Sequence, residues 1–249
     1  MMSAHISASS LGVSVAIVFA TAVLRGYTGF GFAVIAVPLL VLLLEPAEVV
    51  PIVLLLEVVA SLQLLPSVWR SVHWSAVRRL LIGALAGTPL GILVLSQLPG
   101  PEMRLGIAGV VLVTAVSLAA GLQFRSSPGR LTTIAVGLLS GGLNGAVAMS
   151  GPPVVLFFLS TPASPMVGRA SLVMFFTLAD AAAAGFAAVA GLVTGSVLAT
   201  AAALAPALFL GQAIGSRFFD ETKRTTFQRI SLGIMVLVSV LVASQALRD

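Results

Sequence analysis

The chain contains no cysteine and only two histidines, and charged residues amount to 8% of its 249 positions. Without cysteine there is no disulfide framework, no thiolate chemistry and no cysteine-based metal site. His5 lies in the N-terminal tail and His73 in an arginine-rich loop, so no serine–histidine pair can form inside an apolar segment. The metal-binding motif H-E-x-x-H does not occur in the sequence. We therefore expect no enzyme, no bound metal and no cofactor.

Charge is scarce because 59% of the residues are hydrophobic, with a mean hydropathy of +1.14. A soluble domain carries about 25% charged residues. Only Arg25, Glu57 and Asp180 lie deep inside apolar segments. These segments are 11–44, 49–68, 80–98, 105–124, 131–160, 170–193, 196–216 and 230–247. The pattern predicts an all-α, multi-pass integral protein of the cell (cytoplasmic) membrane.

Two apolar segments are too long for a single crossing. Segments 11–44 and 131–160 contain 34 and 30 residues, whereas a straight transmembrane helix needs ~20. Each is interrupted by glycine and then by proline seven residues later, and the pairs are Gly31 with Pro38 and Gly145 with Pro152. Broken helices at corresponding positions of two repeats are typical of a transporter's binding site.

The order of segment types occurs twice along the chain. A shift of 114 residues pairs Gly31 with Gly145, and a shift of 124 residues pairs Gly87 with Gly211. A polar linker at 122–130 contains several turn residues and separates the halves. We predict a polytopic bundle of two repeats, each a Gly/Pro-broken helical hairpin followed by three transmembrane helices. The repeats are expected at residues 1–126 and 127–249.

The distribution of lysine and arginine favours inverted repeats. If segments 11–44 and 131–160 each crossed once, six Lys/Arg residues would lie on each side of the membrane. If each segment enters and returns as two helices of about half its length, ten share one side and only Arg104 and Arg248 lie opposite. Because positive residues concentrate in cytoplasmic loops, we prefer the second arrangement, with both termini on the non-cytoplasmic side. The net charge of +5 thus orients the protein and does not indicate nucleic-acid binding.

The stretches RGYTGFGFAVIAVPLL (25–40) and GLLSGGLNGAVAMSGPPVVLFFL (137–159) resemble the two signature regions of the sulfite exporter TauE/SafE family. Members are multi-spanning permeases with repeat-related Gly-rich motifs that end in proline. The resemblance implies transport of small sulfur-containing anions, such as sulfite or organosulfonates, coupled to protons.

The two breaks predict an anion site made largely of backbone. A helix that restarts after a break has unpaired N–H groups and a partial positive charge at its first turn. Two such ends near the membrane midplane would hold an anion between them. The candidate substrate-binding residues flank the breaks: Arg25, Tyr27, Thr28, Gly29, Gly31, Pro38, Asn144, Gly145, Ser150, Gly151 and Pro152. The alternative is that glycines only allow close helix crossing, which is our interpretation of the series Gly83, Gly87, Gly91 and Gly211, Gly215.

The three membrane-embedded charges have competing interpretations. The guanidinium of Arg25 matches the oxygens of a sulfonate, but a charge at the bilayer centre costs ~2.5–3.5 kcal/mol and must be paired or solvated. Arg25 could instead form a structural ion pair with Glu57 or Asp180, or reach an interface. Glu57 and Asp180 are the proton-coupling candidates, and the alternative is that they only compensate Arg25.

Two other functions share the broken helices. An anion channel would not need Glu57 or Asp180 to titrate, and a carrier for small carboxylates would use the same kind of site. Saturable flux that responds to a pH gradient distinguishes a carrier from a channel. The expected partners are a small anion and the lipid bilayer, and a homo-oligomer is compatible with the sequence.

Overall fold

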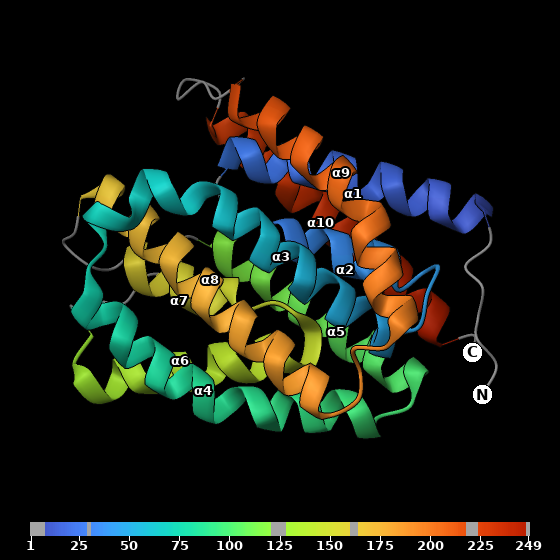
Figure 1. Cartoon of the computed structure of the whole chain (residues 1–249), viewed down its shortest axis with the longest axis horizontal. Coiled ribbons are helices and arrows are strands. Elements are labelled where there is room, and N and C mark those ends of the chain that lie inside the picture. The colour runs from blue at the N-terminus through green and yellow to red at the C-terminus, as the bar shows by residue number, and fades with distance from the viewer. Residues whose placement is uncertain (1–7, 29–30, 121–127, 160–163, 218–223, 248–249) are drawn as a thin grey trace.

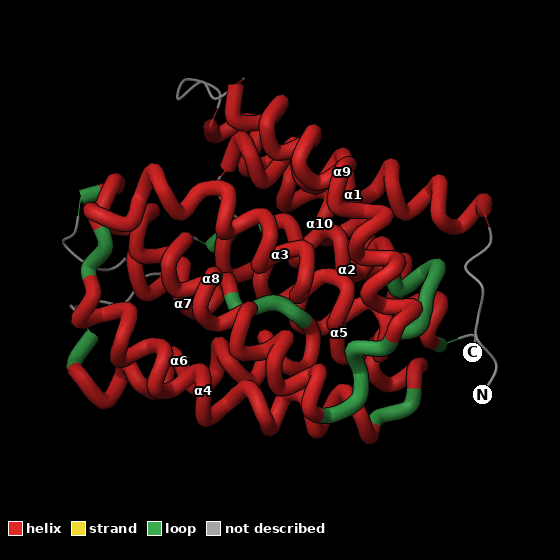
Figure 2. Tube along the Cα trace, viewed as in Figure 1, coloured by secondary structure: helices red, strands yellow, loops and turns green. Residues whose placement is uncertain are grey.

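The computed structural model describes residues 8–28, 31–120, 128–159, 164–217 and 224–247, and within these ranges the chain is helical with short connections (Figure 2). The helices, shown in Figure 1, are α1 (Ala8–Thr28), α2 (Phe32–Leu40), α3 (Pro46–Val68), the 3₁₀ turn η1 (Trp69–Ser71), α4 (Trp74–Gln97), α5 (Gly100–Ala119), α6 (Arg130–Val147), α7 (Gly151–Leu159), α8 (Pro165–Val189), α9 (Gly195–Arg217) and α10 (Arg224–Ala246).

The outer surface of the helix bundle is apolar and its interior contains polar groups. Six of the described helices, α1, α3, α4, α5, α8 and α9, are long and apolar enough to cross a membrane. Large side chains such as Ile82, Leu90 and Val113 are exposed, while Asn144 and Asp180 are buried. This distribution is stable when lipid covers the surface, because lipid does not penalise exposed leucine or valine. The predicted all-α, multi-pass membrane fold is confirmed.

Both long apolar segments are broken, but their two arms are unequal. Helices α1 and α6 have 21 and 18 residues, whereas α2 and α7 have 9 each. At 1.5 Å per residue a nine-residue helix is ~13 Å long, about half of the ~30 Å hydrocarbon layer. The expectation of two arms of similar length is therefore wrong. The chain turns late, at Gly31 (φ 93°) and at Ala148 (φ 55°), since the glycines before Ala148 remain inside α6.

Glycines of α4 and α9 allow two pairs of helices to pack with their backbones in contact. A methyl group built on Gly83, Gly87 or Gly91 of α4 would overlap backbone atoms of α6. The same is true of Gly211 and Gly215 of α9 against α1. Only residues without a side chain permit such an approach. The interpretation of these two glycine series as packing faces is confirmed.

The two close helix pairs make corresponding contacts. Gly26 of α1 lies against the backbone of Gln212 in α9, and Gly145 of α6 lies against that of Thr88 in α4. Gly26 and Gly145 are 119 residues apart, and Thr88 and Gln212 are 124 apart. The second spacing equals the shift of 124 expected from the sequence. The shift of 114 pairs two glycines in different surroundings, because Gly31 lies at a break and Gly145 lies inside α6. Helix α3 packs against α8, and α5 against α10.

Basic residues are concentrated at one end of the helix bundle. Helix α1 begins and α10 ends on the right of Figure 1, whereas α3 ends and α4, α6 and α8 begin on the left. The described basic residues in the helix ends on the left are Arg70, Arg78, Arg79, Arg130 and Arg169. Near the other end, Arg104 of α5 donates to a carboxylate oxygen of Glu45 at 3.1 Å.

Candidate functional site

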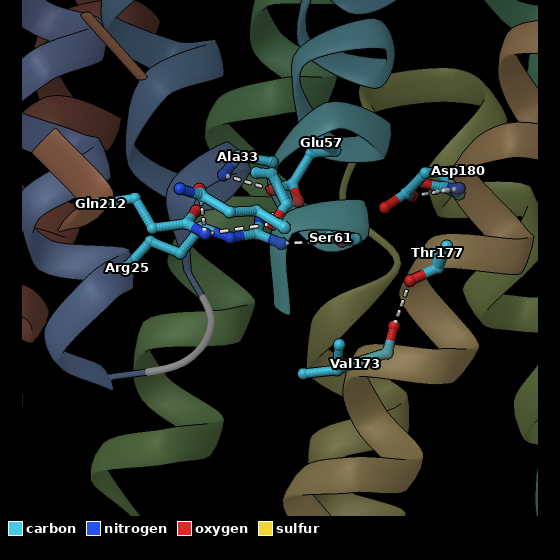
Figure 3. Close-up of polar contacts among 11 residues, drawn as sticks. Arg25, Ala33, Glu57, Ser61, Val173, Thr177, Asp180 and Gln212 are labelled. Carbon is cyan, nitrogen blue, oxygen red and sulfur yellow. Dashed lines mark hydrogen bonds and ion pairs between the residues drawn. The ribbon is translucent and has the colours of Figure 1, made fainter. Parts of the chain in front are cut away.

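Arg25 of α1 forms a buried ion pair with Glu57 of α3. Its guanidinium Nη1 contacts the carboxylate of Glu57 (Figure 3), and the two residues are only 2% and 6% exposed. Arg25 Nη2 donates to Ser61 Oγ at 2.9 Å, one helical turn further along α3. The remaining Nε–H is buried and has no hydrogen-bond partner among the described residues. The ion pair explains how an arginine is accommodated in an apolar segment, since a buried charge must be paired.

Glu57 also connects this ion pair to the half-length helix α2. The backbone N–H of Ala33 donates to Glu57 Oε1 at 3.3 Å. Ala33 lies in the first turn of α2, directly after the left-handed Gly31, where backbone N–H groups lack partners within the helix. A carboxylate of the protein therefore binds at the helix end for which the sequence predicts a substrate anion.

A second polar cluster lies where α6 faces α8. Asn144 Nδ2 donates to Asp180 Oδ1 at 2.9 Å, and the two residues are 0% and 2% exposed. Asn144 Oδ1 has no hydrogen-bond partner in the described part of the chain. Asn144 follows Arg25 by 119 residues and Asp180 follows Ser61 by the same shift. The second half thus has a neutral donor and an acid where the first half has a cation and a hydroxyl.

The start of α7 differs from that of α2 in its supply of N–H groups. Of the first four residues of α7, only Gly151 and Val154 carry an N–H, because Pro152 and Pro153 have none. Ser140 Oγ of α6 donates to the carbonyl oxygen of Ser150 at 2.6 Å and fixes the turn before α7. An anion at this end would therefore find fewer backbone donors than at α2.

The other predicted site residues lie in different surroundings. Gly31 has open space where a side chain would project, whereas Gly145 lies inside α6 with its Cα facing α4. Pro38 is buried within α2. The side chains of Tyr27 and Thr28, and the whole of Gly29, lie outside the described residues.

Two further polar residues, Ser61 and Gln212, belong to the cluster. Ser61 lies four residues after Glu57, so helical periodicity alone could have placed both on one face. Gln212 is buried beside Arg25 (Figure 3), and its Nε2 donates to Ala60 O at 3.1 Å and to Gln63 Oε1 at 3.0 Å. Gln212 Oε1 is a third buried atom for which the described residues provide no hydrogen-bond partner.

These residues form one polar centre within an apolar bundle. Arg25, Glu57 and Gln212 lie together, and Asp180 from the second half of the chain is in the same region of the bundle interior (Figure 3). Ionisable groups inside a membrane bundle mark ion or substrate pathways, and half-length helices that start beside them are a property of secondary transporters. The fold and the site define a multi-pass membrane transporter.

Comparison with known proteins identifies the family. Residues 14–242 match the family model described as sulfite exporter TauE/SafE, and the chain belongs to this family. It is similar to a probable sulfite/organosulfonate exporter TauE from Cupriavidus necator, with 29% identity over 217 residues that cover 84% of each chain. No solved structure matches. The family predicted from the two motifs is confirmed, and this is a family of exporters, not of enzymes.

Proposed function

We propose that this protein is a secondary transporter for small sulfur-containing anions of the sulfite or organosulfonate type. The observation that supports it best is the convergence of Arg25 and the first turn of α2 on a single carboxylate, that of Glu57. A guanidinium binds carboxylate and other oxyanions through the same rigid fork of N–H donors. The name of the Cupriavidus necator relative, a probable sulfite/organosulfonate exporter, points to the same anions.

We place the transported anion between the starts of α2 and α7, with Arg25 and Asn144 as its nearest side chains. Arg25 has a buried Nε–H without a hydrogen-bond partner within the described ranges, and the amide nitrogen of Asn144 carries two N–H groups, one of which donates to Asp180. Glu57 and Asp180 are the two buried acids that contact these side chains, and they are the two candidates for coupling transport to protons. An anion channel with the same donors would not require either acid to change its protonation state.

Transport itself is tested with the purified protein in liposomes. Efflux of sulfite and of isethionate, a small organosulfonate, is expected to saturate with concentration and to change when a pH gradient is imposed. Acetate serves as the carboxylate control and is expected to be a poor substrate. Flux that rises linearly with concentration and ignores the pH gradient would identify a channel, and a preference for acetate would identify a carboxylate carrier.

The two halves are proposed to have opposite orientations in the membrane. Helix α3 ends and α8 begins at the same end of the bundle (Figure 1), which supports this arrangement, as does the concentration of described arginines at that end. In this topology Ser71 and Ser164 lie on the cytoplasmic side, because a half-length helix returns within each broken segment.

Cysteine labelling tests the orientation. Ser71→Cys and Ser164→Cys should react with an impermeant maleimide only from the cytoplasmic side, and Leu98→Cys only from the outside. The unmodified chain has no cysteine and gives the background. Labelling of Ser71→Cys and Ser164→Cys from opposite sides would restore eight single crossings with parallel halves.

A further inference from the structure

The position proposed for the substrate anion is taken by Glu57. Its Oε2 contacts Arg25 Nη1, and its Oε1 accepts the N–H of Ala33 at 3.3 Å. Both donors are therefore engaged by one carboxylate of the protein. With Glu57 only 6% exposed, little water is available to replace these bonds if the carboxylate moves away. Another oxyanion can use the same donors only after Glu57 has left them.

The cost of placing a second anion beside Glu57 makes simultaneous binding unfavourable. Two like charges in a medium of low dielectric repel each other strongly, and a single arginine compensates only one of them. Protonation removes the charge of Glu57 and with it the attraction to Arg25. The vacated guanidinium, its unpartnered Nε–H and the Ala33 N–H then provide donors for a new oxyanion.

We propose that Glu57 is an internal competitor of the transported anion, which binds to Arg25 and the first turn of α2 only when Glu57 has taken up a proton. The inference deepens the proposed function and rests on it. Each binding event takes one proton from solvent onto a Glu57 oxygen and replaces the carboxylate–guanidinium pair by an anion–guanidinium pair. The net charge of the buried cluster is unchanged by this exchange.

The surroundings of Glu57 indicate that Glu57, and not Asp180, is the internal competitor of the anion. The described groups that face Glu57 are Arg25 from α1, Ala33 N–H from α2, the neutral Gln212 from α9 and Asp180 from α8. Arg104 of α5 lies at the end of the bundle and pairs with Glu45 instead. Asp180 accepts its hydrogen bond from the neutral Asn144, so its proton does not free a cation for substrate.

The competition predicts pH-dependent binding of a sulfonate, whose own charge is constant over the useful pH range. Binding linked to the uptake of one proton weakens by up to tenfold per pH unit, roughly, as the pH rises. The affinity of the wild-type protein in detergent for isethionate is expected to follow this trend. Proton uptake on binding, measured with an indicator dye in weakly buffered solution, is expected to approach one per anion.

The variant Glu57→Gln keeps the side-chain shape but cannot become an anion. It is expected to bind isethionate at least tenfold more tightly than wild type at neutral pH and to take up no proton. Glu45→Gln is the matched control, since it makes the same change at a carboxylate near the end of the bundle. This control is expected to behave like wild type in affinity and in proton uptake.

The outcomes separate the inference from the function on which it rests. Wild type that binds isethionate without proton uptake overturns the competition but leaves anion transport standing, and this measurement needs no variant. Loss of proton uptake in Asp180→Asn but not in Glu57→Gln likewise overturns the assignment to Glu57. Absence of isethionate binding and flux at every pH overturns both proposals.

Discussion

Replacement of Gly91 by leucine is expected to prevent the helix bundle from assembling. Its Cα faces the backbone of Gly142 and Ala146 in α6, so even a methyl group has no room unless the two helices separate. Overpacking a core costs typically ~1–3 kcal/mol, and here the obstacle is backbone, which cannot rotate away. We expect a loss of ~3 kcal/mol or more, seen as a low yield of monodisperse protein and a lower melting temperature in detergent.

Gly109→Leu is the matched control for this experiment. Gly109 lies in α5 with no atom of a neighbouring element within 4 Å of the added Cβ. The same substitution is therefore expected to leave yield and melting temperature nearly unchanged. A Gly91→Leu protein as stable as Gly109→Leu would mean that α4 and α6 are not in backbone contact.

Replacement of Arg25 by methionine is expected to leave the Glu57 carboxylate buried without its cation. Breaking a buried ion pair by removing one partner costs ~3–5 kcal/mol. The double variant Arg25→Met, Glu57→Gln has no uncompensated charge and is expected to recover most of the lost stability. Melting temperatures of the wild type and the two variants in one detergent measure this recovery.

Two further variants determine how the result is interpreted. Arg104→Met removes the cation from a pair in which the Glu45 side chain is 63% exposed, so the carboxylate left behind is hydrated and the loss of stability is expected to be smaller than that of Arg25→Met. Arg25→Lys keeps the charge without the planar fork and is expected to bind isethionate more weakly than wild type. A double variant no more stable than Arg25→Met would show that the pair is not what holds Glu57 in the membrane.

The membrane fold follows from composition, because a chain this apolar can only bury its backbone polar groups in helices that cross lipid. The two broken segments were located correctly for the same reason: only glycine and proline interrupt runs long enough to span the bilayer. The lengths of the arms were not predicted. In α6 glycine serves close packing as well as flexibility, and sequence does not distinguish a glycine that ends a helix from one that touches a neighbour.

The site was predictable in its residue types but not in its pairing. Three charges stand out in apolar segments: Arg25, Glu57 and Asp180. The sequence left both acids open as the ion-pair partner of Arg25, and the structure shows that the partner is Glu57. The choice depends on the distance between helices α1, α3 and α8, which no local pattern encodes. Gln212 joins the cluster for the same reason, from a helix 152 residues further along the chain than its partner Ala60.

The glycine contacts also constrain how the buried cluster can open to one side of the membrane and then the other. The pair α1 and α9 joins a helix from the beginning of the chain to one near its end, and the pair α4 and α6 joins the two halves again. A motion that swings the first half of the sequence against the second would have to break both backbone contacts. In the proposed carrier, a hinge at boundaries such as those of the central α3 and α8 would leave both backbone contacts intact, and each moving unit would contain helices from both halves.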